Sequence, residues 1–111
     1  MTYKTHESYA AKRRYQRIRL PKGMLVAWQH SGSREVSRVA TMGLGGLFIA
    51  TTKPAPVGTL LKLIFDVPSG EVRARATVRN IKEGEGMAVG FIAMDYGDRA
   101  RLDQFMKTIL R

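Results

Sequence analysis

The sequence contains no cysteine, which excludes a disulfide framework and any metal site built from thiolates. Its two histidines, His6 and His30, stand far apart and have no partner at a metal-ligand spacing. The short motifs of α/β-hydrolases, zinc proteases and P-loop proteins are also missing. These absences argue against an enzyme and give no indication of a metal or other cofactor.

Long hydrophobic runs are missing as well. No apolar stretch approaches the roughly 18 residues that a membrane-spanning helix needs, and residues 1–7 lack the apolar segment of a secretory signal. The hydrophobic fraction of 44% is nevertheless ordinary for a folded protein, and 111 residues suit one domain. We therefore expect a cytoplasmic domain that does not insert into a membrane.

Acidic residues are scarce. The chain has 9 Asp and Glu against 19 Lys and Arg, a net charge of +10. Residues 1–22 hold seven of the cations and one anion, so more than half of the excess lies in the first fifth of the chain. Such a segment is either a solvated basic tail or a binding element for an anionic partner, such as nucleic acid, a nucleotide or an acidic lipid.

Short apolar or alternating segments, separated by Gly and Pro, predict β-strands. The alternation is clearest where Val72, Ala74, Ala76 and Val78 are interleaved with polar residues. Trp28, Phe48, Phe65 and Phe91 occupy apolar strand contexts that predict core positions. The six predicted strands are Met24–Trp28, Glu35–Ala40, Leu47–Thr51, Leu60–Phe65, Val72–Arg79 and Met87–Ile92.

The C-terminal segment has a helical period instead. Apolar residues from Leu102 to Leu110 recur at i, i+3, i+4, i+7 and i+8, and Asp98 is the predicted N-cap. The predicted fold is mainly β: a six-stranded antiparallel barrel, closed or split, with this helix over one end or seam. A flexible basic arm, residues 1–22, precedes the barrel and helix of residues 23–111.

Two groups of residues have the chemistry of a binding site. Arg13, Arg14 and Arg17 lie within five residues, and their planar guanidinium groups suit phosphates and the O6/N7 edge or face of guanine. The second group is the loop Thr41–Gly46, with glycine at three of its last four positions. Glycine permits positive φ and close approach of a ligand to the backbone, and free N–H groups in such a loop bind anions or base edges. A tight strand connection is the alternative interpretation of this loop.

In this order and spacing, the two groups resemble the signature of PilZ domains. That signature is Arg-x-x-x-Arg on an N-terminal arm, then Asp/Asn-x-Ser-x-x-Gly on a loop that opens a strand. The segments 45–49 and 86–91 are also similar to strands of the family, and 99–110 to its closing helix. PilZ domains are six-stranded barrels that bind the bacterial second messenger cyclic di-GMP.

The resemblance implies that cyclic di-GMP is the ligand. The implied ligand-binding residues are Arg13, Arg14, Arg17, Thr41, Gly43 and Gly46. Thr41 replaces the Asp or Asn of the family, and Gly43 replaces its Ser. Loss of one charge-assisted hydrogen bond costs about 1.5–3 kcal/mol, roughly ten- to a hundredfold in affinity.

Three functions are compatible with these residues. The first is a non-enzymatic cyclic di-GMP receptor whose arm closes over the barrel when ligand binds and which signals through a protein partner. The second is a PilZ-type adaptor that binds no nucleotide and acts by protein contact. The third is a small β-barrel that binds RNA or single-stranded DNA, supported by the basic charge but disfavoured because the aromatic residues are predicted core.

Three further arginines, Arg73, Arg75 and Arg79, alternate along one predicted strand and therefore share a face. That face is either a solvated outer surface of the barrel or an extension of the basic binding surface.

Overall fold

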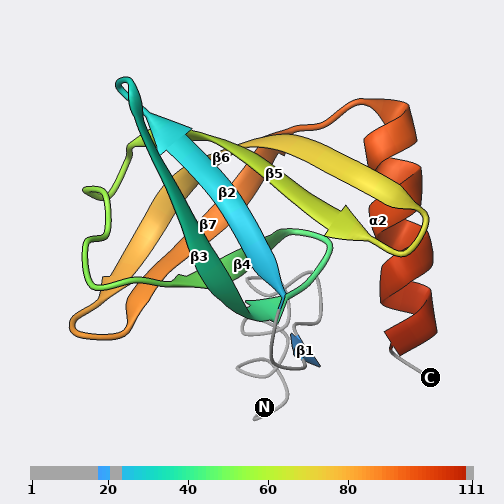
Figure 1. Ribbon diagram of the computed structural model, residues 1–111, viewed down its shortest axis with the longest axis horizontal. Helices are drawn as coiled ribbons and strands as arrows, with labels where there is room; N and C mark the ends of the chain where they lie inside the picture. The colour runs from blue at the N-terminus through green and yellow to red at the C-terminus, as the bar shows by residue number, and fades with distance from the viewer. Residues whose placement is uncertain (1–17, 21–23, 110–111) are drawn as a thin grey trace, which may run out of the picture.

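The computed structural model describes residues 18–20 and 24–109, which form strands and one C-terminal helix around a barrel (Figure 1). The elements are β1 (Ile18–Arg19), β2 (Leu25–His30), β3 (Ser33–Met42), β4 (Gly46–Ala50), β5 (Leu60–Val67), β6 (Gly70–Lys82), β7 (Gly86–Ala93) and α2 (Tyr96–Ile109). All six predicted strands are present, most of them extended by one to three residues at an end. None of the helices in this part of the chain is long and apolar enough to cross a membrane.

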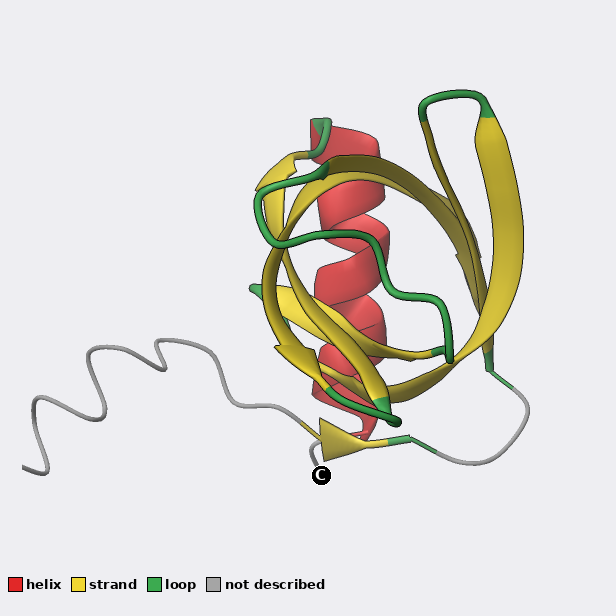
Figure 2. Ribbon diagram, turned by 90° about the vertical axis from the view of Figure 1, so that its left-hand side faces the viewer, coloured by secondary structure: helices red, strands yellow, loops and turns green. Residues whose placement is uncertain are grey.

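Antiparallel pairing joins the strands in the order β3-β2-β5-β6-β7-β4, and a β3–β4 pairing closes the barrel. The predicted six-stranded antiparallel barrel is thus confirmed in its closed form. β2 and β3 form a hairpin around Ser31 and Gly32, whose φ angles of 47° and 79° are those of a type I′ turn. Figure 2 shows this hairpin extending beyond the rest of the barrel.

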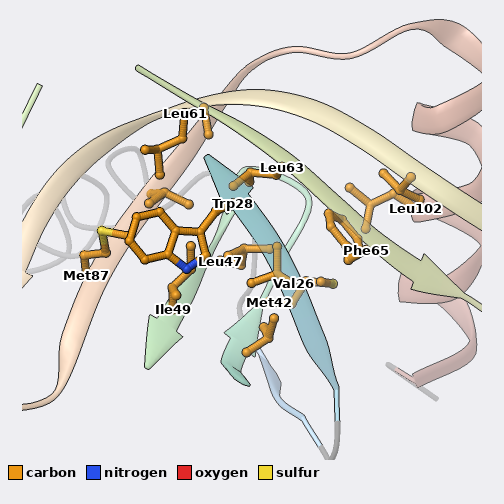
Figure 3. Packing of buried hydrophobic residues seen from close by; sticks show 14 of the residues in the cluster. Val26, Trp28, Met42, Leu47, Ile49, Leu61, Leu63, Phe65, Met87 and Leu102 are labelled. Carbon is orange, nitrogen blue, oxygen red and sulfur yellow. The ribbon is translucent and has the colours of Figure 1, made fainter. Parts of the chain in front are cut away.

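The core fills the inside of the barrel with apolar side chains from every long strand and from α2. Trp28 is 2% exposed and lies among Leu61, Ile49 and Met87 (Figure 3). Its indole Nε1 donates to Ser37 Oγ at 3.0 Å, so the buried polar atom has a partner. Phe65 is also buried, as predicted, whereas Phe48 and Phe91 are only half-buried.

The helix α2 crosses one end of the barrel, as Figure 2 shows in the view along the barrel opening. Leu102 and Met106 are buried in the core, and Phe105 and Ile109 pack at its edge, which confirms the apolar stripe. The predicted N-cap was wrong by one turn. Asp95 Oδ1 accepts the N–H of Asp98 at 2.8 Å, so Asp95 caps the helix.

Asp98 instead attaches the first turn of α2 to the barrel. Its carboxylate forms an ion pair with Arg101 at 2.8 Å, and Arg101 Nε donates to the Glu71 carbonyl of β6, also at 2.8 Å. Burial raises the pKa of Asp98. Hydrogen bonds from the Arg101 side chain and the Arg73 backbone outweigh that effect, and the pKa falls below its ordinary value of 3.8.

We expect Asp98→Asn to destabilise the domain at pH 7 by about 1–3 kcal/mol, because the substitution removes the ionised acceptor. A depressed pKa stabilises the fold at pH values above the unfolded pKa, and this contribution is lost as pH falls through the folded pKa. Urea unfolding from pH 7 to pH 2 should therefore show the two proteins converging below about pH 3.8. Asp103→Asn, at an exposed ion pair with Lys107, is the control and should change stability by less than about 0.5 kcal/mol. A constant difference at all pH values would contradict the assignment.

Candidate ligand-binding site

The predicted glycine loop joins β3 to β4, and Thr41 lies at its start. Met42 is fully buried, so alternation along β3 places Thr41 on the outer face of the barrel. Thr41 is half-buried there, between Arg19 of β1 and Phe48 of β4. Its hydroxyl offers one uncharged acceptor at this position.

Backbone hydrogen bonds fix the loop on three sides. The Gly43 N–H donates to the Gly46 carbonyl, and the Phe91 N–H of β7 donates to the Gly45 carbonyl, both at 2.9 Å. Arg99 of α2 donates to the Leu44 carbonyl at 2.9 Å. These hydrogen bonds hold the loop in one defined conformation against β7 and α2.

These contacts correct two expectations about the loop. The Gly43 N–H is already bonded within the loop, so it is not the free donor that we expected. The N–H groups of Leu44 and Gly45 make no hydrogen bond to any residue that the structure describes, and they are the available donors. None of the three loop glycines has a positive φ, so conformational freedom does not explain their presence.

Close packing explains Gly46 instead. Gly46 pairs with Gly90 of β7, and a Cβ at position 46 would collide with the Val89 carbonyl oxygen and lie 3.0 Å from the Gly90 Cα. The close approach at Gly46 is thus that of the neighbouring strand, and approach of a ligand to the loop stays a prediction. Gly46 and Gly90 have no side chains of their own, and the guanidinium of Arg79 lies over Gly90.

The strand β1 connects the basic arm to this loop. Ile18 pairs with Met42 and Arg19 with Thr41, and the Leu20 N–H donates to the Ala40 carbonyl at 3.1 Å. We did not predict β1, because two residues are too few for a periodic pattern to show. The arginines Arg13, Arg14 and Arg17 lie outside the described residues, but Ile18 is the next residue after Arg17 in the chain.

Two residues beside the loop were misplaced or left open by sequence analysis: Phe48 was predicted as core, and Arg79 was assigned either to a solvated face or to the binding surface. Phe48 lies between the buried Leu47 and Ile49, so alternation places it on the outer face rather than in the core. The guanidinium of Arg79 lies against Gly90, where it would block a Cβ. The alternation of Leu47, Phe48 and Ile49 was a signal for the first. The position of Arg79 depends on pairing between distant strands, which no local pattern reveals.

The three arginines of β6 share the exposed outer face of the strand, as predicted, but they lie in two different surroundings. The pairing of β6 with β7 shifts register between Val78 and Asn80, so Arg79 lies at an irregularity. Arg79 is directed over Gly90, near the glycine loop, whereas Arg73 and Arg75 line a groove near α2. The predicted basic face is therefore divided into two parts with different neighbours.

Comparison with solved structures shows the same fold in several proteins. The PilZ domain of Escherichia coli YcgR with cyclic di-GMP superposes with a TM-score of 0.72 at 20% identity, over 90% of this chain and 92% of that domain. The Bacillus subtilis inhibitor of motility, MotI (DgrA), gives a TM-score of 0.70 at 22% identity, and Borreliella burgdorferi PlzA in complex with cyclic di-GMP gives 0.63 at 10%. The match to MotI covers 88% of this chain and 51% of MotI. The match to PlzA covers 92% of this chain and 45% of PlzA. This chain spans about half the length of MotI.

The sequence itself is informative at family level. No curated protein matches it significantly. The family model described as PilZ domain, however, matches residues 11–108, from the arginine arm to the last turn of α2. That match includes both predicted motifs and the whole barrel, and with it the chain belongs to the PilZ domain family.

Proposed function

We propose that this domain is a non-enzymatic receptor for cyclic di-GMP, which it binds on the outer face of the barrel between the arginine arm and the glycine loop. The observation that carries the proposal is the β1–β3 pairing, which brings the residue after Arg17 opposite Met42. The residue that follows the arginine motif therefore lies beside the start of the glycine loop, about 25 residues later in the sequence, which supports a shared site. The ligand complexes of YcgR and PlzA support the choice of ligand, since both have this fold.

Each part of the site has a role in this proposal. Arg13, Arg14 and Arg17 supply bidentate contacts to guanine edges and phosphates. Thr41 accepts from the guanine edge, while the free N–H groups of Leu44 and Gly45 donate to the ligand. Gly46 adds no side chain beside the loop, and the guanidinium of Arg79 over Gly90 offers a planar cation on which a purine can stack.

Calorimetric titration with cyclic di-GMP at moderate salt tests the proposal, with a mixed-sequence oligonucleotide as the parallel ligand. We expect saturable binding of cyclic di-GMP. Absence of binding at high micromolar ligand would favour an adaptor that acts by protein contact alone. Oligonucleotide binding with a steep salt dependence, and no response to cyclic di-GMP, would favour a nucleic-acid-binding barrel.

The double substitution Thr41→Asp with Gly43→Ser should raise the affinity for cyclic di-GMP about tenfold or more. It restores one charged acceptor, and a charge-assisted hydrogen bond is worth about 1.5–3 kcal/mol. Position 43 has no positive φ, so serine is compatible with the backbone conformation there. Thr51→Asp with Gly97→Ser, away from the loop and with no positive φ at position 97, is the control. Equal or weaker binding by the first variant would contradict the role assigned to Thr41.

We further propose that the ligand changes the contacts of the arm and so presents a new surface to a protein partner. Arg19 and Thr41 are paired, so a ligand held by the loop also acts on the strand that continues the arm. Hydrogen exchange over residues 1–17 should slow when cyclic di-GMP is added. Equal exchange with and without ligand would overturn the switch and leave binding itself intact.

A further inference from the structure

A groove with a volume of about 420 Å³ lies on the outer face of β5 and β6, beside the turn from β7 into α2. Ile64, Ala93 and Met94 give it an apolar lining, and Lys62 and Arg75 stand at one border. β5 and β6 cross α2 at this end of the barrel (Figure 1). The groove is separate from the glycine loop, because Arg75 and Arg79 are four residues apart on β6, roughly 13 Å along an extended strand.

The cations of this groove belong to a row that crosses four neighbouring strands. The pairing places Arg34 of β3 opposite Gln29 of β2, Gln29 opposite Lys62 of β5, and Lys62 opposite Arg75 of β6. Residues paired in this way share one face of the sheet, and all four are exposed. Within residues 18–20 and 24–109, none of Arg34, Lys62 and Arg75 forms an ion pair.

An apolar row runs parallel to the cationic one. Val36 pairs with Ala27, and Ala27 pairs with Ile64. Each of these three residues lies two positions along its strand from a member of the cationic row. Val36 is 63% exposed, and nearby Leu25 is 54% exposed. Two residues along a strand span about 6.6–6.8 Å, so the face presents a stripe of positive charge beside a stripe of apolar surface.

The acidic residues that line the groove already have partners, and the exposed Asp66 lies beyond Ile64 on β5, on the side away from Lys62. Asp95 caps α2, and Asp98 is paired with Arg101. Arg73, at the end of the apolar row, is paired with Glu71 at 2.8 Å. The unpaired charge at the Arg34–Lys62–Arg75 side of the face is thus positive.

We propose that this face docks an acidic, amphipathic segment of a protein partner. The glutamates or aspartates of that segment meet Arg34, Lys62 and Arg75. Its apolar side chains cover Val36 and Ile64 and enter the groove. Charge complementarity and the neighbouring apolar stripe together define this occupant.

The same observations disfavour the two other anionic partners. A nucleic acid would leave the apolar row uncovered, and the two rows offer no aromatic ring for base stacking. An anionic lipid surface is flat and would leave the groove of about 420 Å³ unfilled, whereas the side chains of a peptide can enter it. The proposal does not depend on cyclic di-GMP, and its test is carried out without that ligand.

The test uses the whole chain, labelled with ¹⁵N, and a synthetic peptide of about 15 residues with a leucine stripe at helical spacing flanked by glutamates. We expect saturable amide shifts at Lys62, Ile64, Arg75 and Ala93. Peptides with glutamine for glutamate, or serine for leucine, should bind at least tenfold more weakly. A mixed-sequence oligonucleotide and vesicles of phosphatidylcholine with phosphatidylserine are titrated in parallel.

The double variant Lys62→Glu with Arg75→Glu should weaken peptide binding at least tenfold. Lys53→Glu with Lys82→Glu changes the net charge equally at exposed positions outside the face and should bind like the wild type. If the charge reversal impairs folding in thermal unfolding, Lys62→Gln with Arg75→Gln replaces it, with the same direction expected. The proposal is overturned by an equal loss in both double variants, or by no shifts at millimolar peptide. It is also overturned if oligonucleotide or vesicles bind this face more tightly than the peptide does.

Discussion

Replacement of Arg13 or Arg17 by alanine is expected to abolish measurable binding of cyclic di-GMP by the isolated protein. Each arginine provides charge-assisted, bidentate contacts, and the loss of one such contact costs about 1.5–3 kcal/mol, or roughly ten- to a hundredfold in Kd. Thr41 lacks the charge of an Asp, so the loop alone has little affinity with which to compensate. Calorimetry of the two single variants and the double variant measures the effect.

Arg34→Ala is the matched control for these variants. Arg34 is an exposed arginine near the tip of the β2–β3 hairpin, away from the glycine loop, and its removal lowers the net charge by the same amount. It should bind cyclic di-GMP like the wild type. Equal weakening by Arg34→Ala and Arg17→Ala would show that net charge, and not the arm motif, attracts the ligand.

Gly46→Ala is expected to destabilise the domain by about 2–3 kcal/mol, the upper part of the range of about 1–3 kcal/mol for added volume in a closely packed region. The new Cβ would collide with the Val89 carbonyl oxygen, which belongs to the backbone and cannot turn aside as a side chain can. For a domain of this size, each kcal/mol lowers Tm by several degrees, so a decrease of roughly 10 °C is expected. Thermal unfolding and urea unfolding, with an unchanged m-value, provide the measurement.

Gly97→Ala provides the corresponding control within the same fold. A Cβ at position 97 would meet its nearest neighbour at 3.6 Å, an ordinary contact, in the first turn of α2. Alanine is favoured over glycine in a helix by up to about 1 kcal/mol, so this variant should be as stable as the wild type or slightly more stable. A Gly46→Ala protein as stable as Gly97→Ala would contradict the close packing of β4 on β7.

The sequence was sufficient to predict the barrel strands and the helix, because hydrophobic alternation and turn residues are local signals. In the sequence, polar residues alternate with Val72, Ala74, Ala76 and Val78. These four apolar residues are buried in β6. The helix cap was misplaced because Asp95 and Asp98 are both suitable caps, and only the hydrogen bond identifies Asp95. β1 was missed because its stability comes from pairing with β3 rather than from its own two residues.

The candidate site was harder to predict, since its details depend on contacts between distant segments. Glycine at positions 43, 45 and 46 suggested unusual backbone angles, but the structure uses Gly46 to let β7 approach. Alternation predicts that Arg79 is on the outer face, but its position over Gly90 depends on the pairing of β6 with β7. The motif spacing did indicate which loop belongs with the arm, and the β1–β3 pairing is consistent with that inference.

The attachment of the glycine loop to β7 has a consequence for the order of folding. The loop is held by the Gly46–Gly90 pair and by the Phe91 N–H, which come more than 40 residues later in the chain. Contacts of such long sequence separation form slowly, because chain entropy must be lost before they contribute stability. The β2–β3 hairpin can therefore form early, whereas the loop acquires its final shape only when the last strand is in place. The loop can therefore bind a ligand only late in folding. A ligand at this loop then binds only chains whose barrel is complete.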